Sequence, residues 1–248
     1  MFTQNDIDTY QFIRGTDLKH RETAWSKIYL DTTHGKVHVV QRWQYSFTVA
    51  HGMTAWTDDE KLSFHYALSS AVTGTWDSQT PLPNSSDPTV QDFINLVRKV
   101  SNVRIGVTGL APFAKQFAGK GLDIDFDIVL TGSNPHWHVT LEKVPSTSQS
   151  RANVNWDSRR IHLFSIDNSP SGACQNGRNA ACTTGFVTTP HEFGHTMLND
   201  DEYTVGARSR SDLKSIMNIG NEVRPRHYSF IAGQLNHMVP GCTFRAML

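Results

Sequence analysis

The sequence has no excess of charge of either sign, because 23 lysine and arginine residues balance 23 aspartate and glutamate residues. A nucleic-acid-binding surface normally requires a basic bias or a basic stripe. Blocks of like charge, which are typical of interaction tails, are also missing. We therefore expect no nucleic-acid partner.

Long apolar runs are missing as well. No window of about 18 residues is continuously apolar, so the sequence predicts no membrane span. The first residues, Met1 to Tyr10, are polar and lack the apolar core of a signal peptide. Two localisations remain, namely the cytoplasm and export by a route that needs no such signal. A fragment of a longer polypeptide would look the same.

Cysteine is scarce, with three residues in the whole chain. No CxxC pair occurs, which argues against a cysteine zinc ribbon. Cys174 and Cys182 flank a polar segment and could form a disulfide in an oxidising compartment. Three unpaired thiols, with Cys242 as the third, are an equally good interpretation, and the odd count does not decide between them.

Apolar residues recur with strand-like or helical periodicity in several segments, and no internal repeat is visible. Residues 26–50 are expected to form strands, with 27–30 and 37–40 on either side of a turn and a β-rich run that ends near Val49. Further strands are expected at 124–130, 136–144 and 160–166. The expected helices are 58–72 and 89–100. A chain of 248 residues can bury a core of its own without disulfides or metals.

The residues HEFGH at positions 191–195 carry the clearest chemistry in the chain. On a helix, His191 and His195 lie about one turn apart, so both imidazoles project from one face and can hold one metal ion. Glu192 follows the first histidine and points into the same cleft. There it can accept a proton from a water molecule that a catalytic zinc ion binds.

The start of this helix has two interpretations. Thr189 can cap a helix whose first residue is Pro190, which places the motif in the first turns. Alternatively, Thr189 and Glu192 form a capping box, and the two histidines that follow are ordinary helix residues. The second interpretation gives Glu192 a role in stability and none in catalysis.

A catalytic zinc site normally uses three protein ligands and keeps one position open. Three carboxylates after the helix are candidates for the third ligand: Asp201, Glu202 and Glu222. Asn199 and the residue after it can end the helix in the left-handed conformation, which would turn Asp201 or Glu202 back toward the metal. Glu222 would be a ligand from a later segment, but Pro225 follows too soon for a long helix there.

The pattern HExxHxxLxxD at positions 191–201 resembles the zinc motif of the metzincin metallopeptidases in its Asp-ending, snapalysin-like form. Tyr203 also fits this pattern. Met217 stands where that family has a methionine-containing turn beneath the metal. The chain differs at Leu198, where the family has a turn glycine. The resemblance implies that Asp201 is the third zinc ligand.

A longer C-terminal segment resembles peptidase-like toxin domains that are attached to bacterial type VI secretion spike proteins and related effectors. The shared order is HEFGH, DEY, SIM and VRPxHY, at positions 191–195, 201–203, 215–217 and 223–228. This match covers about the last quarter of the chain. It implies a toxin that is secreted or delivered without a signal peptide, and a cognate immunity protein as a partner.

Other polar residues have weaker signals. His227 or Tyr228 could donate a hydrogen bond to the oxyanion that forms when water attacks a carbonyl, or could pack locally. His136 and His138 alternate on an expected strand, where they are a second metal site or ordinary strand histidines. The zincin resemblance implies that the strand at 160–166 edges the cleft, where an extended substrate could pair with it.

We therefore expect an α+β fold, specifically a zincin-like metallopeptidase domain with a mixed, twisted sheet and a long, central zinc-binding helix. Residues 1–248 are expected to form one domain, with a sheet and helix lobe at about 1–187. The zinc helix and C-terminal lobe would occupy about 188–248.

The expected function is hydrolysis of peptide bonds in a protein or peptide substrate. Zn²⁺ would be held by His191, His195 and Asp201, with Glu192 as the general base. One alternative is a zinc amide hydrolase that acts on peptidoglycan through the same site. Another is a binding module with a structural zinc, which would need a fourth protein ligand.

Overall fold

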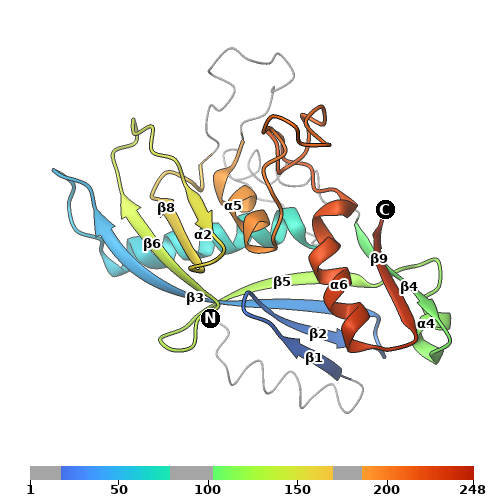
Figure 1. Cartoon of the computed structure of the whole chain (residues 1–248). Coiled ribbons are helices and arrows are strands. Elements are labelled where there is room, and N and C mark those ends of the chain that lie inside the picture. Colours follow the sequence, from blue (N-terminus) through green and yellow to red (C-terminus); the bar gives the residue numbers. More distant parts are fainter. Residues whose placement is uncertain (1–17, 79–102, 170–185) are drawn as a thin grey trace, which may run out of the picture.

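The computed structural model describes residues 18–78, 103–169 and 186–248 (Figure 1). Within these ranges the strands are β1 (Leu18–Glu22), β2 (Lys27–Asp31), β3 (Lys36–Val49), β4 (Arg104–Gly109), β5 (Asp123–Leu130), β6 (Trp137–Lys143), β7 (Asn153–Asn155), β8 (Arg160–Phe164) and β9 (Cys242–Met247). The helices are α2 (Asp58–Trp76), α4 (Pro112–Gln116), α5 (Thr188–Thr196), α6 (Ser229–Met238) and a short 3-10 helix, η2 (Pro225–Tyr228). The expected α+β class with a mixed sheet is confirmed.

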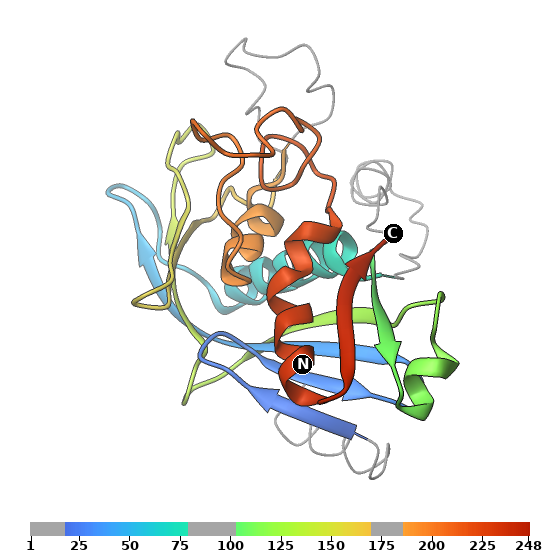
Figure 2. The ribbon, with the colours of Figure 1, turned by 45° about the vertical axis from the view of Figure 1, so that its right-hand side comes forward.

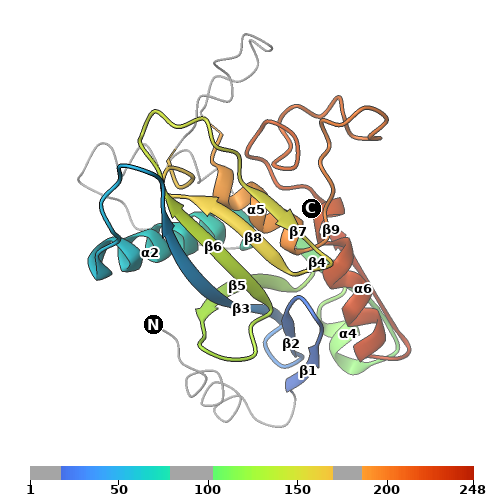
Figure 3. The same cartoon turned by 60° about the vertical axis from the view of Figure 1, so that its left-hand side comes forward.

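The main sheet has seven strands, with the order β1-β2-β3-β6-β8-β7 and β5 paired to β3. Strand β3 is long enough to pair in parallel with β5 along its first part and with β6 along its last part. Strand β8 is parallel to β6, whereas the short β7 is antiparallel to β8 and forms the edge. Figure 3 shows β6, β8 and β7 in succession, with α5 behind them.

Helix α2 has a local reason to begin where it does. Thr57 and Glu60 form a reciprocal capping box at its N-terminus, which satisfies backbone donors that a helix start leaves free. Phe64, Leu68 and Val72 recur at helical spacing and are buried. The expected helix at 58–72 is confirmed and continues one further turn. That turn brings its end against α5, where it supports the candidate site.

One buried cluster unites both ends of the chain. It includes residues from β2 near the N-terminus and Phe244 on β9 near the C-terminus. Trp43, Trp76 and Trp137 are its largest fully buried side chains. Figure 2 shows α6 lying alongside β9, which closes the side of the molecule next to β1. The sheet and α2 thus form a rigid base for α5.

The expected strands correspond to β2, β3, β5, β6 and β8, whose ends differ by a few residues, and the expected end of the β-rich run near Val49 is confirmed by β3. The expected helix at 89–100 and the pair Cys174 and Cys182 lie outside the described residues. Cys242 is buried as a free thiol. None of the helices in the described ranges combines the length and the apolar content that a membrane crossing needs.

Two expectations, about the length of the motif helix and about the strand before it, are wrong. The motif helix is short, because α5 has 9 residues whereas α2 has 19. The strand at 160–166 is not an edge, because β8 pairs with β6 on one side and with β7 on the other. Strand β7 has only three residues and follows a turn-rich segment, so its period-2 signal is too short to recognise in a sequence. The edge of the sheet next to α5 is therefore β7.

Candidate metal centre

Helix α5 begins one residue before Thr189, and Thr189 lies inside its first turn. The backbone N–H of Thr189 donates to the carbonyl of Asp167, which anchors the helix to the loop after β8. The hydroxyl of Thr189 is buried and makes no hydrogen bond within the described part of the chain. Thr189 is therefore not the helix cap, and the capping box with Glu192 does not form.

Two histidines of α5 and one aspartate beyond it converge on a common point. The Nε2 atoms of His191 and His195 each lie 3.2 Å from Oδ1 of Asp201. The three potential ligand atoms all lie within 4.8 Å of one another. In a tetrahedral zinc site with ligands at about 2.0–2.1 Å, neighbouring ligand atoms are roughly 3.3 Å apart. The two nitrogen–oxygen separations therefore fit the edges of such a site.

The other nitrogen of each imidazole bonds to the backbone. Nδ1 of His191 donates to the carbonyl of Ile216 at 2.6 Å, and Nδ1 of His195 donates to that of Asn199 at 2.7 Å. A carbonyl can only accept, so each Nδ1 carries a proton, and each Nε2 has a lone pair to offer to a metal ion when the imidazole is neutral. Both rings are thus fixed in the orientation and tautomer that a metal ligand needs.

The turn after α5 brings Asp201 back to the histidines. Leu198 has a φ of 63°, the left-handed conformation that usually requires glycine. Its N–H donates to the carbonyl of His195, and the N–H of Asn199 donates to that of Gly194, which together form a Schellman motif. The expected left-handed residue at Asn199 is wrong by one position. Leu198 thus keeps the backbone turn for which the metzincin pattern has glycine.

Two buried carboxylate oxygens at this point lack a hydrogen-bond partner among the described residues. They are Oδ1 of Asp201 and Oε2 of Glu192. Buried polar atoms are nearly always paired with protein, water or an ion. Two acceptors left unsatisfied beside two imidazole lone pairs are therefore what a cation site requires. The donor set of two nitrogens and one carboxylate oxygen is one that zinc takes.

The pKa values of the metal-free chain point in the same direction. Burial would raise the pKa of Asp201, but the imidazoles of His191 and His195 hold it well below its usual range. Burial would lower the pKa of His195, but Asp201 and Glu192 raise it overall. Burial raises the pKa of Glu192, which favours its acting as a proton acceptor near neutral pH. A proton or a cation near Asp201 and Glu192 is thus stabilised by their carboxylates.

The other two candidate ligands are engaged elsewhere. Glu202 receives two hydrogen bonds from the guanidinium of Arg226, at 2.6 and 2.7 Å. Glu222 pairs with Arg224 at 2.7 Å. Asp201 is thus the one of the three expected carboxylates that the structure brings to the two imidazoles.

His227 and Tyr228 both bond within the protein, so the structure does not present either side chain as a free donor for the expected oxyanion role. Nδ1 of His227 accepts the backbone N–H of Arg224, and its Nε2 lies 3.1 Å from Glu202. The Tyr228 hydroxyl donates to the carbonyl of Trp76, and the ring is fully buried. The Tyr228 ring packs against Trp76 at the end of α2. The sequence around Tyr228 does not reveal this partner.

Several contacts of the site have no recognisable sequence signal. The ring of Tyr203 stacks on that of His191 with an interplanar angle of 17°. The indole of Trp156, next to β7, donates to the carbonyl of His195 at 2.6 Å. His136, by contrast, bonds Arg42 and Glu22, as an ordinary structural histidine does. The Tyr203 and Trp156 contacts join segments far apart in the chain or lie outside the motif, so local spacing does not reveal them.

Met217 lies beneath α5 and is fully buried. A Cβ atom added to Gly194 would meet the Met217 sulfur at 2.3 Å and the Trp76 ring at 3.0 Å. The glycine in HEFGH is therefore explained by close packing of the methionine turn. Met217 has a packing role here.

Gly194→Ala should lower the free energy of unfolding by about 1–2 kcal/mol, because overpacking outweighs the gain in helix propensity. Gly233→Ala on α6 is the matched control, because its Cβ meets nothing within 4 Å. The control should be neutral or more stable by up to about 1 kcal/mol. Urea unfolding of both variants measures this. Equal effects would contradict the packing argument.

Acid should remove the stability that Glu202 contributes. Burial would raise its pKa, but hydrogen bonds from Arg226 and His227 outweigh burial and hold the pKa at about 2. The folded pKa is below the unfolded value, so this contribution is present above about pH 4.3 and disappears as the pH falls toward 2. The free energy of unfolding of wild type should exceed that of Glu202→Gln by about 1–3 kcal/mol at pH 6, by roughly half as much at pH 3 and by little at pH 2. Urea unfolding with a chelator present tests this, and a pH-independent difference would contradict it.

Comparison with known protein families, with curated proteins and with solved structures finds no match to this chain. The observations that bear on function are those of the candidate site. That site consists of three convergent ligand atoms, a buried carboxylate beside them and a sheet edge next to the helix that carries them.

Proposed function

We propose that this protein is a zinc-dependent metallopeptidase with a zincin-like fold. The observation that carries the proposal is the convergence of His191, His195 and Asp201 beside the unpartnered carboxylate of Glu192. Three protein ligands leave a tetrahedral ion with one open position, as catalytic zinc sites require. The mixed sheet, with α5 packed against its β7 edge, supports the zincin-like assignment.

His191, His195 and Asp201 would hold the zinc ion. When bound, zinc acts as a Lewis acid that polarises a carbonyl and lowers the pKa of water toward neutrality. The backbone carbonyls of Ile216 and Asn199 keep both imidazoles in the ligating tautomer. The chain thus supplies a ligand set whose orientation is fixed before the metal binds.

Glu192 is the proposed general base. It is buried, its raised pKa reflects that burial, and its Oε2 has no protein partner within the described ranges. It would accept the proton of the attacking water and transfer it to the leaving amine. The hydroxyl of Tyr203 is the proposed donor to the oxyanion, in place of His227 or Tyr228. Burial raises the pKa of Tyr203, so its hydroxyl keeps the proton that it would donate.

The edge strand β7 is the proposed place where substrate binds. One side of β7 pairs with β8, and Trp156 just after it bonds the His195 carbonyl. An extended peptide could add to the other side through main-chain hydrogen bonds. Such a peptide would run past the two imidazoles, which suits hydrolysis of an internal bond.

The chemistry is tested by incubating the zinc-loaded protein with a mixture of peptides and identifying products by mass spectrometry. A chelator should abolish cleavage, and added zinc should restore it. Cleavage of purified peptidoglycan but of no peptide would favour the amide hydrolase alternative. A binding module with structural zinc would need a fourth protein ligand, and the metal-ligating group found in the described residues has three.

The toxin resemblance extends the proposal to the setting in which the enzyme acts. We propose that the chain is secreted or delivered by a bacterial secretion system and is neutralised by a cognate immunity protein. Expression in a bacterial cytoplasm or periplasm should then inhibit growth, and the Glu192→Gln variant should not. Equal growth with both forms in both compartments would contradict the toxin role.

A further inference from the structure

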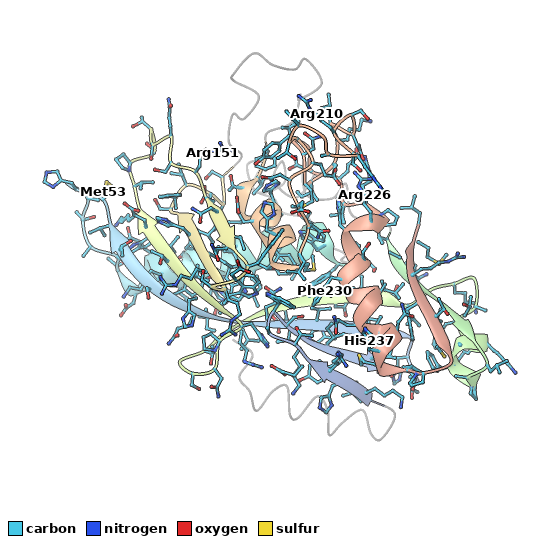
Figure 4. The ribbon with its side chains drawn as sticks, viewed as in Figure 1. Met53, Arg151, Arg210, Arg226, Phe230 and His237 are labelled. Atoms are coloured by element: carbon cyan, nitrogen blue, oxygen red, sulfur yellow. The ribbon has the colours of Figure 1, made fainter. Side chains whose placement is uncertain are left out.

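An arginine without a partner stands at the rim of the candidate metal centre. Arg151 precedes β7 by two residues and is exposed. No hydrogen bond or ion pair within the described ranges engages its guanidinium. Figure 4 shows Arg151 above the sheet, on the other side of the α5 region from Arg210. An unpaired guanidinium here is available to a ligand.

The local structure fixes where this arginine can reach. Ala152, Val154 and Trp156 alternate along β7 and pack on the core, and Trp156 is bonded to the zinc helix. Strand β7, which begins two residues after Arg151, is therefore held against α5. A peptide paired with the free side of β7 would pass Arg151 about 7 Å beyond Asn153, because a strand rises about 3.3 Å per residue.

The positive charge of Arg151 acts on two groups of the candidate site, which belong to different segments. Burial raises the pKa of Glu192 on α5 and of Tyr203 in the loop after it. The positive charge of Arg151 works in the opposite direction on each of them. The Arg151 guanidinium is thus near enough to two separate segments of the site to interact electrostatically with a group on each.

Charge balance indicates what the arginine would bind. The positive charge of Arg151 has no ion-pair counterpart within the described ranges. A substrate carboxylate would supply it, and a guanidinium can bind a carboxylate through two parallel hydrogen bonds.

We propose that Arg151 binds a carboxylate of the substrate close to the scissile bond, so that the enzyme prefers acidic peptides. This inference rests on the proposed peptidase function for its setting. The carboxylate can come from an aspartate or glutamate side chain or from the C-terminus of the peptide. Arg151 is then a specificity-determining residue outside the ligand set.

The test compares peptide mixtures that carry aspartate or asparagine at one position, because these side chains have nearly the same shape. Wild type should cleave the aspartate peptides with a kcat/KM about 10- to 100-fold higher, as expected for a charge-assisted contact. Arg151→Ala should bring this ratio to about one, and Arg151→Lys should keep part of it. Arg160→Ala, an exposed arginine on β8, should leave the ratio unchanged.

A second readout does not depend on catalysis. Zinc-loaded Glu192→Gln protein captures peptides from the same mixtures, and mass spectrometry measures the enrichment of aspartate over asparagine forms. Enrichment that disappears with Arg151→Ala supports the carboxylate site, whether or not wild type cleaves a peptide. Absence of cleavage by wild type would refute only the peptidase function. Cleavage without any aspartate preference, or a preference that survives Arg151→Ala, overturns the inference and leaves the peptidase function standing. Peptides with amidated C-termini distinguish a side-chain carboxylate from a terminal one.

Discussion

Glu192→Gln should reduce peptide hydrolysis by about 10²–10⁴-fold or more and leave one zinc ion bound per chain. Glutamine has nearly the same shape as glutamate, so the packing of this buried side chain on α5 should survive. It has no basic carboxylate, so the attacking water loses its proton acceptor. Zinc content should not change, because Glu192 is outside the group of convergent ligand atoms.

Turnover, zinc content and melting temperature should be measured on the same preparation. Glu60→Gln is the matched control, because Glu60 does form a capping box, with Thr57 at the start of α2. The control should show at most a small loss of stability and full turnover. Full turnover in Glu192→Gln would mean that the buried carboxylate is not the base. Loss of zinc in this variant would mean that Glu192 is a ligand.

Local patterns in the sequence predict the elements that position the site. Helical spacing of Phe64, Leu68 and Val72 predicts α2, and the histidine spacing places both imidazoles on one face of α5. These features depend on neighbours within a turn or two. A single sequence contains that information because backbone periodicity fixes which side chains share a face.

Long-range contacts of the site are not predictable in this way. The Ile216 carbonyl that orients His191 is a backbone group, so no residue type marks it. The left-handed turn falls on Leu198, although local propensity favours Asn199 for this conformation. Tyr228 looks like an accessible donor in the sequence, but the fold places its ring against Trp76. The His191 and Tyr228 contacts depend on segments far apart in the chain.

Asp201→Asn should weaken zinc binding by at least about 100-fold, whereas Glu202→Gln should leave zinc affinity nearly unchanged. Removing a ligand should cost more than removing an outer-shell partner, which typically lowers metal affinity by 10–100-fold. The Asp201 carboxylate lies 3.2 Å from both imidazole Nε2 atoms. The neighbouring carboxylate of Glu202 is turned to Arg226 and His227. Two adjacent acidic residues should therefore give opposite results.

Competition with a chromophoric chelator gives the zinc affinity of each variant, and urea unfolding of the metal-free forms gives the stability. Asp201→Asn should lose affinity while its metal-free fold persists, because removing one carboxylate leaves two neutral imidazoles held by the Ile216 and Asn199 carbonyls. Glu202→Gln should lose stability at neutral pH and keep its zinc. The reverse pattern would make Glu202 the ligand. Equal loss of zinc in both variants would mean that the turn at Leu198 positions the two carboxylates as one unit.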